Sequence, residues 1–178
     1  MKIRFSMGLL TAAALIALAL GFSVHAASKA TAGKGERASV SAKRDSAVGQ
    51  LQLTPEQWRA RLDDEQFRVL REEGTEHAFT GAYWKEYRSG MFRCAGCGLR
   101  LFSSKTKFDS RTGWPSFWKP IAAAHVIEKP DAHFGGMAIE VECARCEGHL
   151  GHVFDDGPDP TGLRYCINSA SLSFVPSM

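Results

Sequence analysis

Apolar positions recur at helical spacing between residues 54 and 74. Thr54-Pro55-Glu56 offers an N-cap, a proline for the first helical position and an acid for the first turn, which together predict the start of a helix. Asp63-Asp64-Glu65 begins the same pattern again, and Gly74 is expected to end it. The segment therefore predicts two short helices in succession.

Beyond Gly74, the pattern changes to short apolar and aromatic runs separated by Gly, Pro, Ser and Asp, which is typical of strands. The predicted strands are Gly90–Cys94, Leu99–Ser103, His125–Glu128, Met137–Cys143, His152–Phe154, Arg164–Ile167 and Leu172–Val175. The chain contains no internal repeat and no nucleotide-binding Gly-rich loop. The pattern predicts a mainly β domain with antiparallel strands, preceded by short N-terminal helices.

Residues 1–26 have the pattern of a signal peptide. Lys2 and Arg4 precede an uncharged apolar stretch that ends in Val24-His25-Ala26, where a signal peptidase is expected to cut. A retained membrane anchor is the alternative, but the stretch is rich in alanine and interrupted by Gly and Thr, so it is weak as a permanent span. We expect cleavage after Ala26, no membrane contact afterwards, and a periplasmic or otherwise exported protein.

Residues 27–50 contain no aromatic residue and consist mainly of Ala, Ser, Gly, Lys and Arg. Such a segment cannot bury enough apolar surface to offset the entropy of ordering it, so we predict a flexible linker. The folded domain then spans residues 51–178. Its 15 basic and 17 acidic residues give a net charge of −2, against +3 for the whole chain, and this mildly acidic balance argues against nucleic-acid binding.

Four of the five cysteines form two C-x-x-C pairs, Cys94–Cys97 and Cys143–Cys146. Two such knuckles supply four thiolates, the ligand set of a structural zinc site with no open position. Two disulfides or redox-active pairs are the alternative, which an oxidising compartment would favour. Because neither pair opens a helix in a βαβ unit, as a thioredoxin-like pair would, we predict one structural Zn²⁺ per chain.

The fifth cysteine, Cys166, lies in the predicted strand Arg164–Ile167. Strand alternation places Arg164, Cys166 and Asn168 on one face. A guanidinium near a thiol favours the thiolate, and a carboxamide can orient a substrate or a water. A buried structural cysteine is the alternative, although an apolar core position would rarely have both of these neighbours.

Two histidines, His149 and His152, follow directly on the second knuckle. They could be metal ligands, general acids or ordinary loop residues, and ligation is the weakest option because four cysteines already complete a site. Imidazole exchanges protons near neutral pH, so a centre of Cys166 and these histidines is chemically coherent. In Gly113-Trp114-Pro115, the indole is either a core aromatic or a rigid pocket wall.

These features occur within a series of motifs that resembles the B-type methionine sulfoxide reductases, which reduce the R epimer of methionine sulfoxide. The matching stretches are Gly74-Thr75-Glu76, Cys94–Cys97, Lys107–Ser110, Gly113–Phe117, His149–Phe154, Asp156–Pro158 and Arg164–Ser169. They run in the family's order and cover nearly everything from residue 53 to 174. The resemblance implies two antiparallel β-sheets stapled by zinc, and an enzyme that repairs oxidised methionine in proteins.

The resemblance also implies roles for individual residues. Cys166 is the nucleophile that attacks the sulfoxide sulfur and is left as a sulfenic acid. His149 and His152, with water, deliver protons to the sulfoxide oxygen, and Asn168 helps orient it. The substrate-binding residues are Trp114, which packs against the S-methyl group, Arg164 and Phe154.

Two positions depart from the family's pattern. Many members have a resolving cysteine just before Gly-Trp-Pro, where this chain has Thr112, so recycling is expected to need an external, thioredoxin-like thiol reductant. The family also often has an arginine just before Glu140-Val141, where this chain has Ala138-Ile139. We expect a monomer. The rival functions are a non-catalytic zinc module and a thiol–disulfide oxidoreductase that uses the C-x-x-C pairs.

Overall fold

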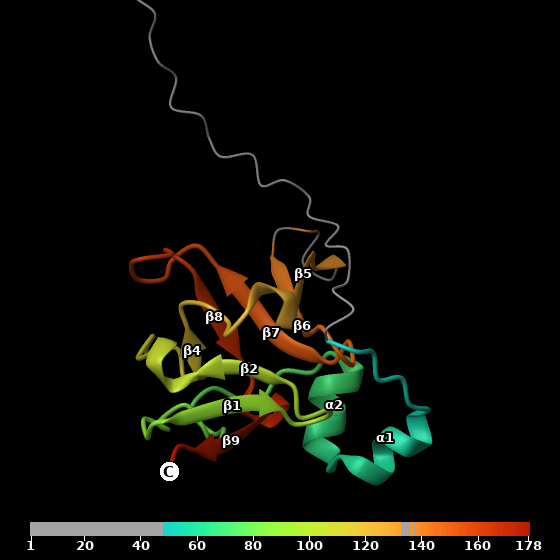
Figure 1. The fold of residues 1–178 in the computed structure, drawn as a ribbon. Helices are drawn as coiled ribbons and strands as arrows, with labels where there is room; N and C mark the ends of the chain where they lie inside the picture. The colour runs from blue at the N-terminus through green and yellow to red at the C-terminus, as the bar shows by residue number, and fades with distance from the viewer. Residues whose placement is uncertain (1–47, 133–135, 137) are drawn as a thin grey trace, which may run out of the picture. The chain divides into compact units, whose positions relative to one another are not determined.

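The computed structural model describes residues 48–132, 136 and 138–178 (Figure 1). The predicted signal peptide, the predicted linker up to residue 47, and Met137, the first residue of a predicted strand, lie outside the described residues. Within the described ranges, no helix combines the length and the apolar character needed to span a membrane.

Two short helices open the domain as predicted, α1 (Pro55–Arg61) and α2 (Asp64–Glu72). Both begin with a reciprocal capping box, in which the N-cap side chain, Thr54 or Asp63, accepts a hydrogen bond from the backbone N–H of a glutamine three residues later. The glutamine side chain accepts in turn from the N-cap N–H. The caps fix where each helix starts.

The end of α2 differs from the prediction in one detail. Glu73, and not Gly74, adopts the left-handed conformation that closes the helix, with φ 55°. The Gly74 N–H then donates to the Arg68 carbonyl at 2.9 Å. Gly74 is still required, because a Cβ there would lie 2.9 Å from the same carbonyl oxygen.

The strands form two antiparallel sheets, as the family resemblance implied. The smaller sheet has the order β2–β1–β9 and consists of β1 (Gly90–Cys94), β2 (Arg100–Ser103) and β9 (Leu172–Pro176). The larger has the order β3–β4–β8–β7–β6–β5 and consists of β3 (Lys107–Phe108), β4 (Ser116–Phe117), β5 (Val126–Pro130), β6 (Ile139–Cys143), β7 (His149–Phe154) and β8 (Arg164–Ile167). Short 3₁₀ turns follow β2 at η1 (Ser104–Thr106), precede β5 at η2 (Ala123–His125) and precede β9 at η4 (Ser169–Ser171).

Strands β1 and β8 have the predicted bounds, while β3 and β4 were not predicted. Each of these two strands has only two residues, too few to show an alternating pattern. Strand β7 begins at His149, three residues before the predicted start. This earlier start affects the site described below.

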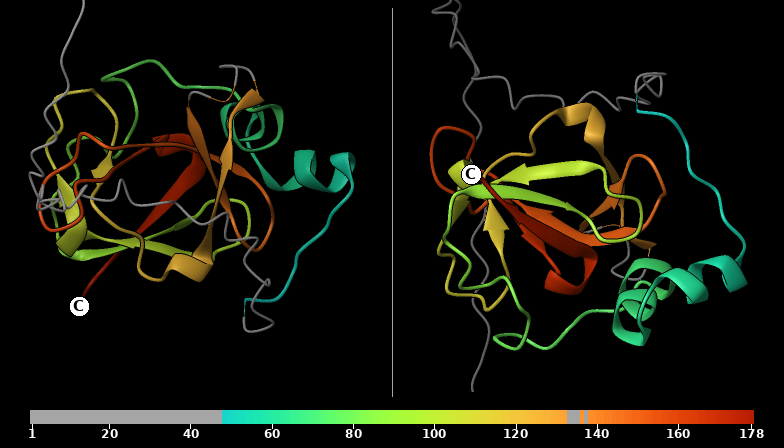
Figure 2. Two further views of the ribbon diagram at one scale, coloured as in Figure 1. Left: turned by 90° about the horizontal axis from the view of Figure 1, so that it is seen from above. Right: turned by 60° about the horizontal axis from the view of Figure 1, so that its bottom comes forward.

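Aromatic side chains join the two sheets. Phe102 of β2 stacks on Phe117 of β4 with ring centroids 4.5 Å apart, and Phe92 of β1 meets Phe117 edge-on at 5.0 Å. Tyr165 of β8 packs on the same group, 5.8 Å from Phe102. Figures 1 and 2 show the sheets facing one another, with α1 and α2 at one side. The core therefore lies between the sheets, and the outer face of the larger sheet is left for polar residues.

The segment before Leu51 also contacts the domain. Val48 is buried, and its carbonyl accepts a hydrogen bond from Arg145 Nε at 2.9 Å. Gln50 Nε2 donates to the Ala144 carbonyl at 3.0 Å. Residues 48–50, within the predicted linker, thus pack against the turn that carries the second pair of cysteines.

Candidate active site and metal centre

The two C-x-x-C pairs form the same turn twice. Cys94 N–H donates to the Leu99 carbonyl at 2.8 Å, and Cys143 N–H donates to the Gly148 carbonyl at 2.9 Å. The residue after each second cysteine is left-handed, with φ 74° at Gly98 and 54° at Glu147. The first turn ends β1 of the smaller sheet and the second ends β6 of the larger one, so the pairs bring the two sheets together.

The four sulfurs of Cys94, Cys97, Cys143 and Cys146 converge, all lying within 4.8 Å of one another. Cys94 Sγ lies 3.6 Å from Cys146 Sγ, and Cys97 Sγ lies 3.4 Å from Cys143 Sγ. Each of these contacts joins one C-x-x-C pair to the other. A tetrahedral ion with metal–sulfur bonds of about 2.3 Å requires sulfurs about 3.8 Å apart. The cluster therefore fits a metal ion.

The four thiols influence one another's ionisation. Hydrogen bonding to Cys143 lowers the pKa of Cys97, whereas hydrogen bonding within the cluster and burial raise the pKa of Cys94. Four adjacent thiolates would repel one another strongly without a positive ion between them. The donor set is thus that of a closed metal centre.

A second group of functional side chains crosses the outer face of the larger sheet. The strand register places Cys166 of β8 opposite His152 of β7 on one side and Ser116 of β4 on the other. It continues from His152 to Glu140 of β6 and from Glu140 to Lys129 of β5. Directly opposite residues share a face. These five residues therefore form one row, which we call the polar row.

An irregularity in β7 brings His149 to the same region. Val141 pairs with Gly151 and Glu142 with His149, which leaves Leu150 as an extra residue in β7. In a regular strand, residues three apart face opposite sides, and the extra residue reverses this for His149 and His152. Their ring centroids are 5.5 Å apart. The two predicted histidines are thus neighbours.

Gly151 is required at this point by close packing. A Cβ there would lie 2.1 Å from the carbonyl oxygen of Cys166, a separation that no side chain can occupy. The backbones of β7 and β8 therefore approach each other closely at Cys166.

Each histidine is held by a buried carboxylate that we did not predict. His149 Nδ1 lies 2.6 Å from Glu140 Oε1, and His152 Nε2 lies 2.6 Å from Asp131 Oδ2. No local motif marks these acids, because they come from a different strand and from the segment after β5. The two pairs therefore fix the orientations of the imidazole rings.

Lys129 of β5 lies beside two acids of β6. Its Nζ lies 3.3 Å from Glu140 Oε2 and 2.8 Å from Glu142 Oε1. The polar row therefore ends in a cation that is paired with the carboxylate of the neighbouring strand.

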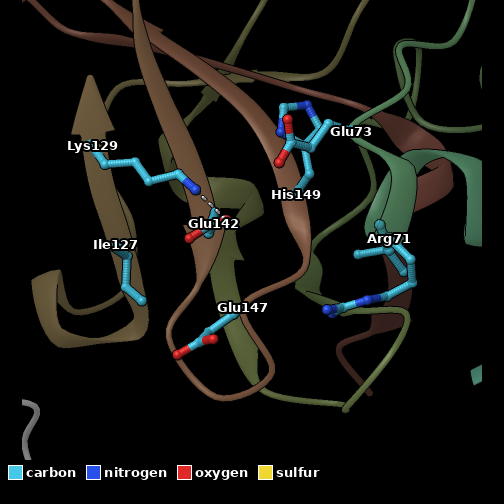
Figure 3. Close-up of a pocket in the computed structure, with 8 residues that line it drawn as sticks. Arg71, Glu73, Ile127, Lys129, Glu142, Glu147 and His149 are labelled. Atoms are coloured by element: carbon cyan, nitrogen blue, oxygen red, sulfur yellow. Dashed lines mark hydrogen bonds and ion pairs between the residues drawn. The ribbon is translucent and has the colours of Figure 1, made fainter. Parts of the chain in front are cut away.

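His149 also lines a pocket of about 430 Å³ (Figure 3). The charged residues around this pocket are Arg71, Glu73, Lys129, Glu142 and Glu147. Burial raises the pKa of Glu142. His149 Nε2 has no hydrogen-bond partner in the described part of the chain. His149 thus connects the polar row with a pocket lined by titratable groups.

Cys166 is half-buried beside a chain of hydroxyl groups. Its Sγ lies 3.8 Å from Thr112 Oγ1, which is 2.8 Å from Ser110 Oγ, and Ser110 Oγ is 2.7 Å from Ser116 Oγ. Thr112, in the position of the family's resolving cysteine, thus lies against Cys166.

The expected stabilisation of the Cys166 thiolate by Arg164 is smaller than the opposing effect of burial. Burial raises the pKa of the Cys166 thiol, and the Thr112 hydroxyl and the Arg164 charge offset only part of this effect. Arg164 is also engaged by Asp156 through two hydrogen bonds of 2.8 Å, and its guanidinium lies 4.3 Å from the centre of the Phe154 ring. The sequence reasoning missed Asp156 as the residue that orients Arg164.

Trp114 and Asn168 are connected through one residue of the segment after α2. Trp114 is half-buried, and its indole N–H donates to the Glu76 carbonyl at 3.2 Å. Asn168 is buried; its oxygen accepts from the Glu76 N–H at 3.0 Å and its Nδ2 donates to the Leu150 carbonyl at 3.1 Å. Phe154, with 39% of its side chain exposed, lies at the solvent-facing end of β7.

A free thiol beside two carboxylate-bound histidines, on a β-sheet tied by a four-cysteine centre, defines a cysteine-dependent enzyme of the mainly β class. The model of the SelR domain matches residues 62–176. A peptide methionine sulfoxide reductase MsrB of Thiobacillus denitrificans is 61% identical over 123 residues, which cover 69% of this chain and 93% of the relative. The enzyme of the same name from Pseudomonas putida is 56% identical over 126 residues, covering 71% of this chain and 95% of the relative. The chain therefore belongs to the family of B-type peptide methionine sulfoxide reductases.

Proposed function

We propose that this protein reduces methionine-R-sulfoxide in oxidised proteins, with Cys166 as the nucleophile. The observation that carries the proposal is the position of this thiol, outside the metal cluster and opposite His152 in the polar row. The relatives are named peptide methionine sulfoxide reductases, which supports the same substrate class. A non-catalytic metal module would have no need for this arrangement.

In the first step, the Cys166 sulfur attacks the sulfoxide sulfur while the sulfoxide oxygen is protonated. The oxygen is then transferred to Cys166, which becomes a sulfenic acid, and methionine is released. The sulfoxide gains two electrons and Cys166 loses two. Burial raises the pKa of Cys166, so proton transfer near the thiol is part of the step.

His149 and His152 supply the protons. Glu140 and Asp131 each hold one nitrogen of a ring and fix its orientation, and an imidazole can act as the general acid toward the sulfoxide oxygen. Asn168 has a second N–H besides the one bound to Leu150, and it helps orient the oxygen.

The methyl group of the substrate packs against Trp114, which follows Thr112 by two residues and precedes Ser116 by two. Both of these neighbours flank Cys166. Phe154 is exposed and pairs with Arg164, whose guanidinium stacks on its ring, so this end of β7 and β8 offers a surface on which a polypeptide can lie.

We assign the four-cysteine cluster to one structural Zn²⁺. When bound, the ion cross-links the two sheets, and four thiolates leave it no open position for substrate. Tetrahedral geometry and thiolate ligands favour zinc over harder ions.

Recycling requires an external thiol, because the remaining four cysteines are zinc ligands and Thr112 has no sulfur. The thiol condenses with the sulfenic acid to give a mixed disulfide and water, and a second thiol then releases Cys166. A dithiol of the thioredoxin type fits this sequence. We infer export to the periplasm, so this reductant would be a periplasmic, thioredoxin-like domain, and the enzyme would act as a monomer.

The test is turnover of separated R and S sulfoxides by wild type and Cys166→Ser. The R epimer alone should be reduced, and Cys166→Ser should be inactive while keeping its metal. One equivalent of R sulfoxide should add 16 mass units to Cys166 as a dimedone-reactive sulfenic acid. Activity of Cys166→Ser, or reduction of the S epimer only, would contradict the proposal.

A further inference from the structure

Glu76 is a buried acid, 5% exposed, whose carboxylate is bound by backbone groups. Its Oε1 accepts from the Ser169 N–H at 2.7 Å, and its Oε2 accepts from the Ala170 N–H at 2.9 Å. Among the described residues it makes no ion pair. Charge-assisted hydrogen bonds of this kind are strong and directional. The carboxylate therefore fixes the segment around residue 76 to η4, immediately after Asn168.

The backbone of Glu76 contacts both residues that orient the substrate. Its N–H donates to Asn168 Oδ1 at 3.0 Å, and its carbonyl accepts from the Trp114 indole N–H at 3.2 Å. The two peptide groups that flank the Glu76 Cα therefore set the separation between the Asn168 carboxamide and the Trp114 indole.

Close packing keeps this segment in place. A Cβ at Gly81 would lie 2.5 Å from Glu76 Oε1 and 2.4 Å from Ser169 Oγ, so the chain passes directly over the carboxylate. Phe79 N–H donates to the Gly113 carbonyl at 2.9 Å, one residue before Trp114. Residues 76–81 therefore bridge the end of β8 and the turn that carries the indole.

We propose that Glu76 is a positioning residue for the reductase reaction. Through Ser169 and Ala170 it anchors residues 76–81, and through its own backbone it holds Trp114 and Asn168 at a fixed separation. The inference rests on the proposed function, in which these two residues contact the methyl group and the oxygen of the sulfoxide. Glu76 then governs which epimer is presented to Cys166.

The test compares Glu76→Gln with wild type on both epimers. Glutamine turns an NH₂ group toward a backbone N–H, so one hydrogen bond is lost and the segment shifts. Misplacement by about 1 Å can cost on the order of 10²-fold in rate. We expect kcat for the R sulfoxide to fall at least about tenfold, and the preference for R over S to fall as well. A purely structural role would lower the amount of folded enzyme without changing the preference.

The matched control is Glu86→Gln, which removes an acid of the same connection that is paired with Arg88. It should leave kcat and the epimer preference unchanged. Glu76→Asp keeps the charge but reaches only one of the two N–H groups, so it should give an intermediate loss of kcat and of epimer preference. This variant replaces Glu76→Gln in the test if Glu76→Gln does not fold.

A measurement on wild type completes the test. The Trp114 indole N–H, assigned with Trp114→Phe, should be protected from hydrogen exchange because it is bonded to the Glu76 carbonyl. Fast exchange of this proton, or normal kcat and epimer preference in a folded Glu76 variant, would overturn the proposal. Absence of turnover in wild type itself would instead reject the proposed function.

Discussion

Thr112→Cys should convert the enzyme into one that resolves its own sulfenic acid. Thr112 Oγ1 lies 3.8 Å from Cys166 Sγ, whereas a disulfide requires about 2.05 Å between sulfurs. Residue 112 lies outside the strands, so rotation of the two cysteine side chains with a small local shift would bring the sulfurs together. The new thiol should therefore condense with the sulfenic acid and release water.

The resulting cross-link joins residues 54 positions apart, for which the chain-entropy model gives a stabilisation of about 4 kcal/mol. This value is an upper limit, because any strain in the loop subtracts from it. The oxidised variant should thus unfold at a higher denaturant concentration than its reduced form.

The assay is intact-mass analysis after one equivalent of R sulfoxide and alkylation of free thiols. Wild type should gain 16 mass units, whereas Thr112→Cys should lose two hydrogens and fail to react with dimedone. Ser110→Cys is the control, since within the described residues Ser110 contacts Thr112 and Ser116 and makes no hydrogen bond to Cys166. A persistent sulfenic acid in Thr112→Cys would refute the inferred geometry.

Three further predictions concern the metal, the protons and the thiol. Cys146→Ser should lose the metal and most of its folded protein, whereas Cys166→Ser should keep one metal per chain. Metal analysis and circular dichroism measure both effects. A Cys146→Ser protein that is folded, metal-free and active would refute the structural role of the metal. His152→Ala should retain its metal but slow sulfenic acid formation by on the order of 10²-fold in single-turnover kinetics. An unchanged rate would show that His152, held by Asp131, does not supply a proton. Arg164→Met should raise the pKa of Cys166 further, so that alkylation by iodoacetamide needs a higher pH; an unchanged pH profile would show that this charge does not reach the thiol.

The four-cysteine cluster and the strand position of Cys166 could be predicted because their signals are local. The C-x-x-C spacing defines each knuckle, and the alternation around Cys166 places Tyr165 and Ile167 in the core. The carboxylates on His149 and His152 could not be predicted, since Glu140 and Asp131 reach the histidines only through strand pairing. The net pKa of Cys166 was also beyond local reasoning, because burial depends on the whole sheet.

The polar row has a consequence for insertions and deletions. A single residue added within β8 would turn Cys166 toward Phe102 and Phe117 and place an apolar side chain opposite His152. The exposed tip of the β7–β8 connection, residues 158–161, is free of this constraint because it lies outside the paired strands. Insertions or deletions within residues 158–161 should therefore preserve activity, whereas the same changes within β8 should abolish it.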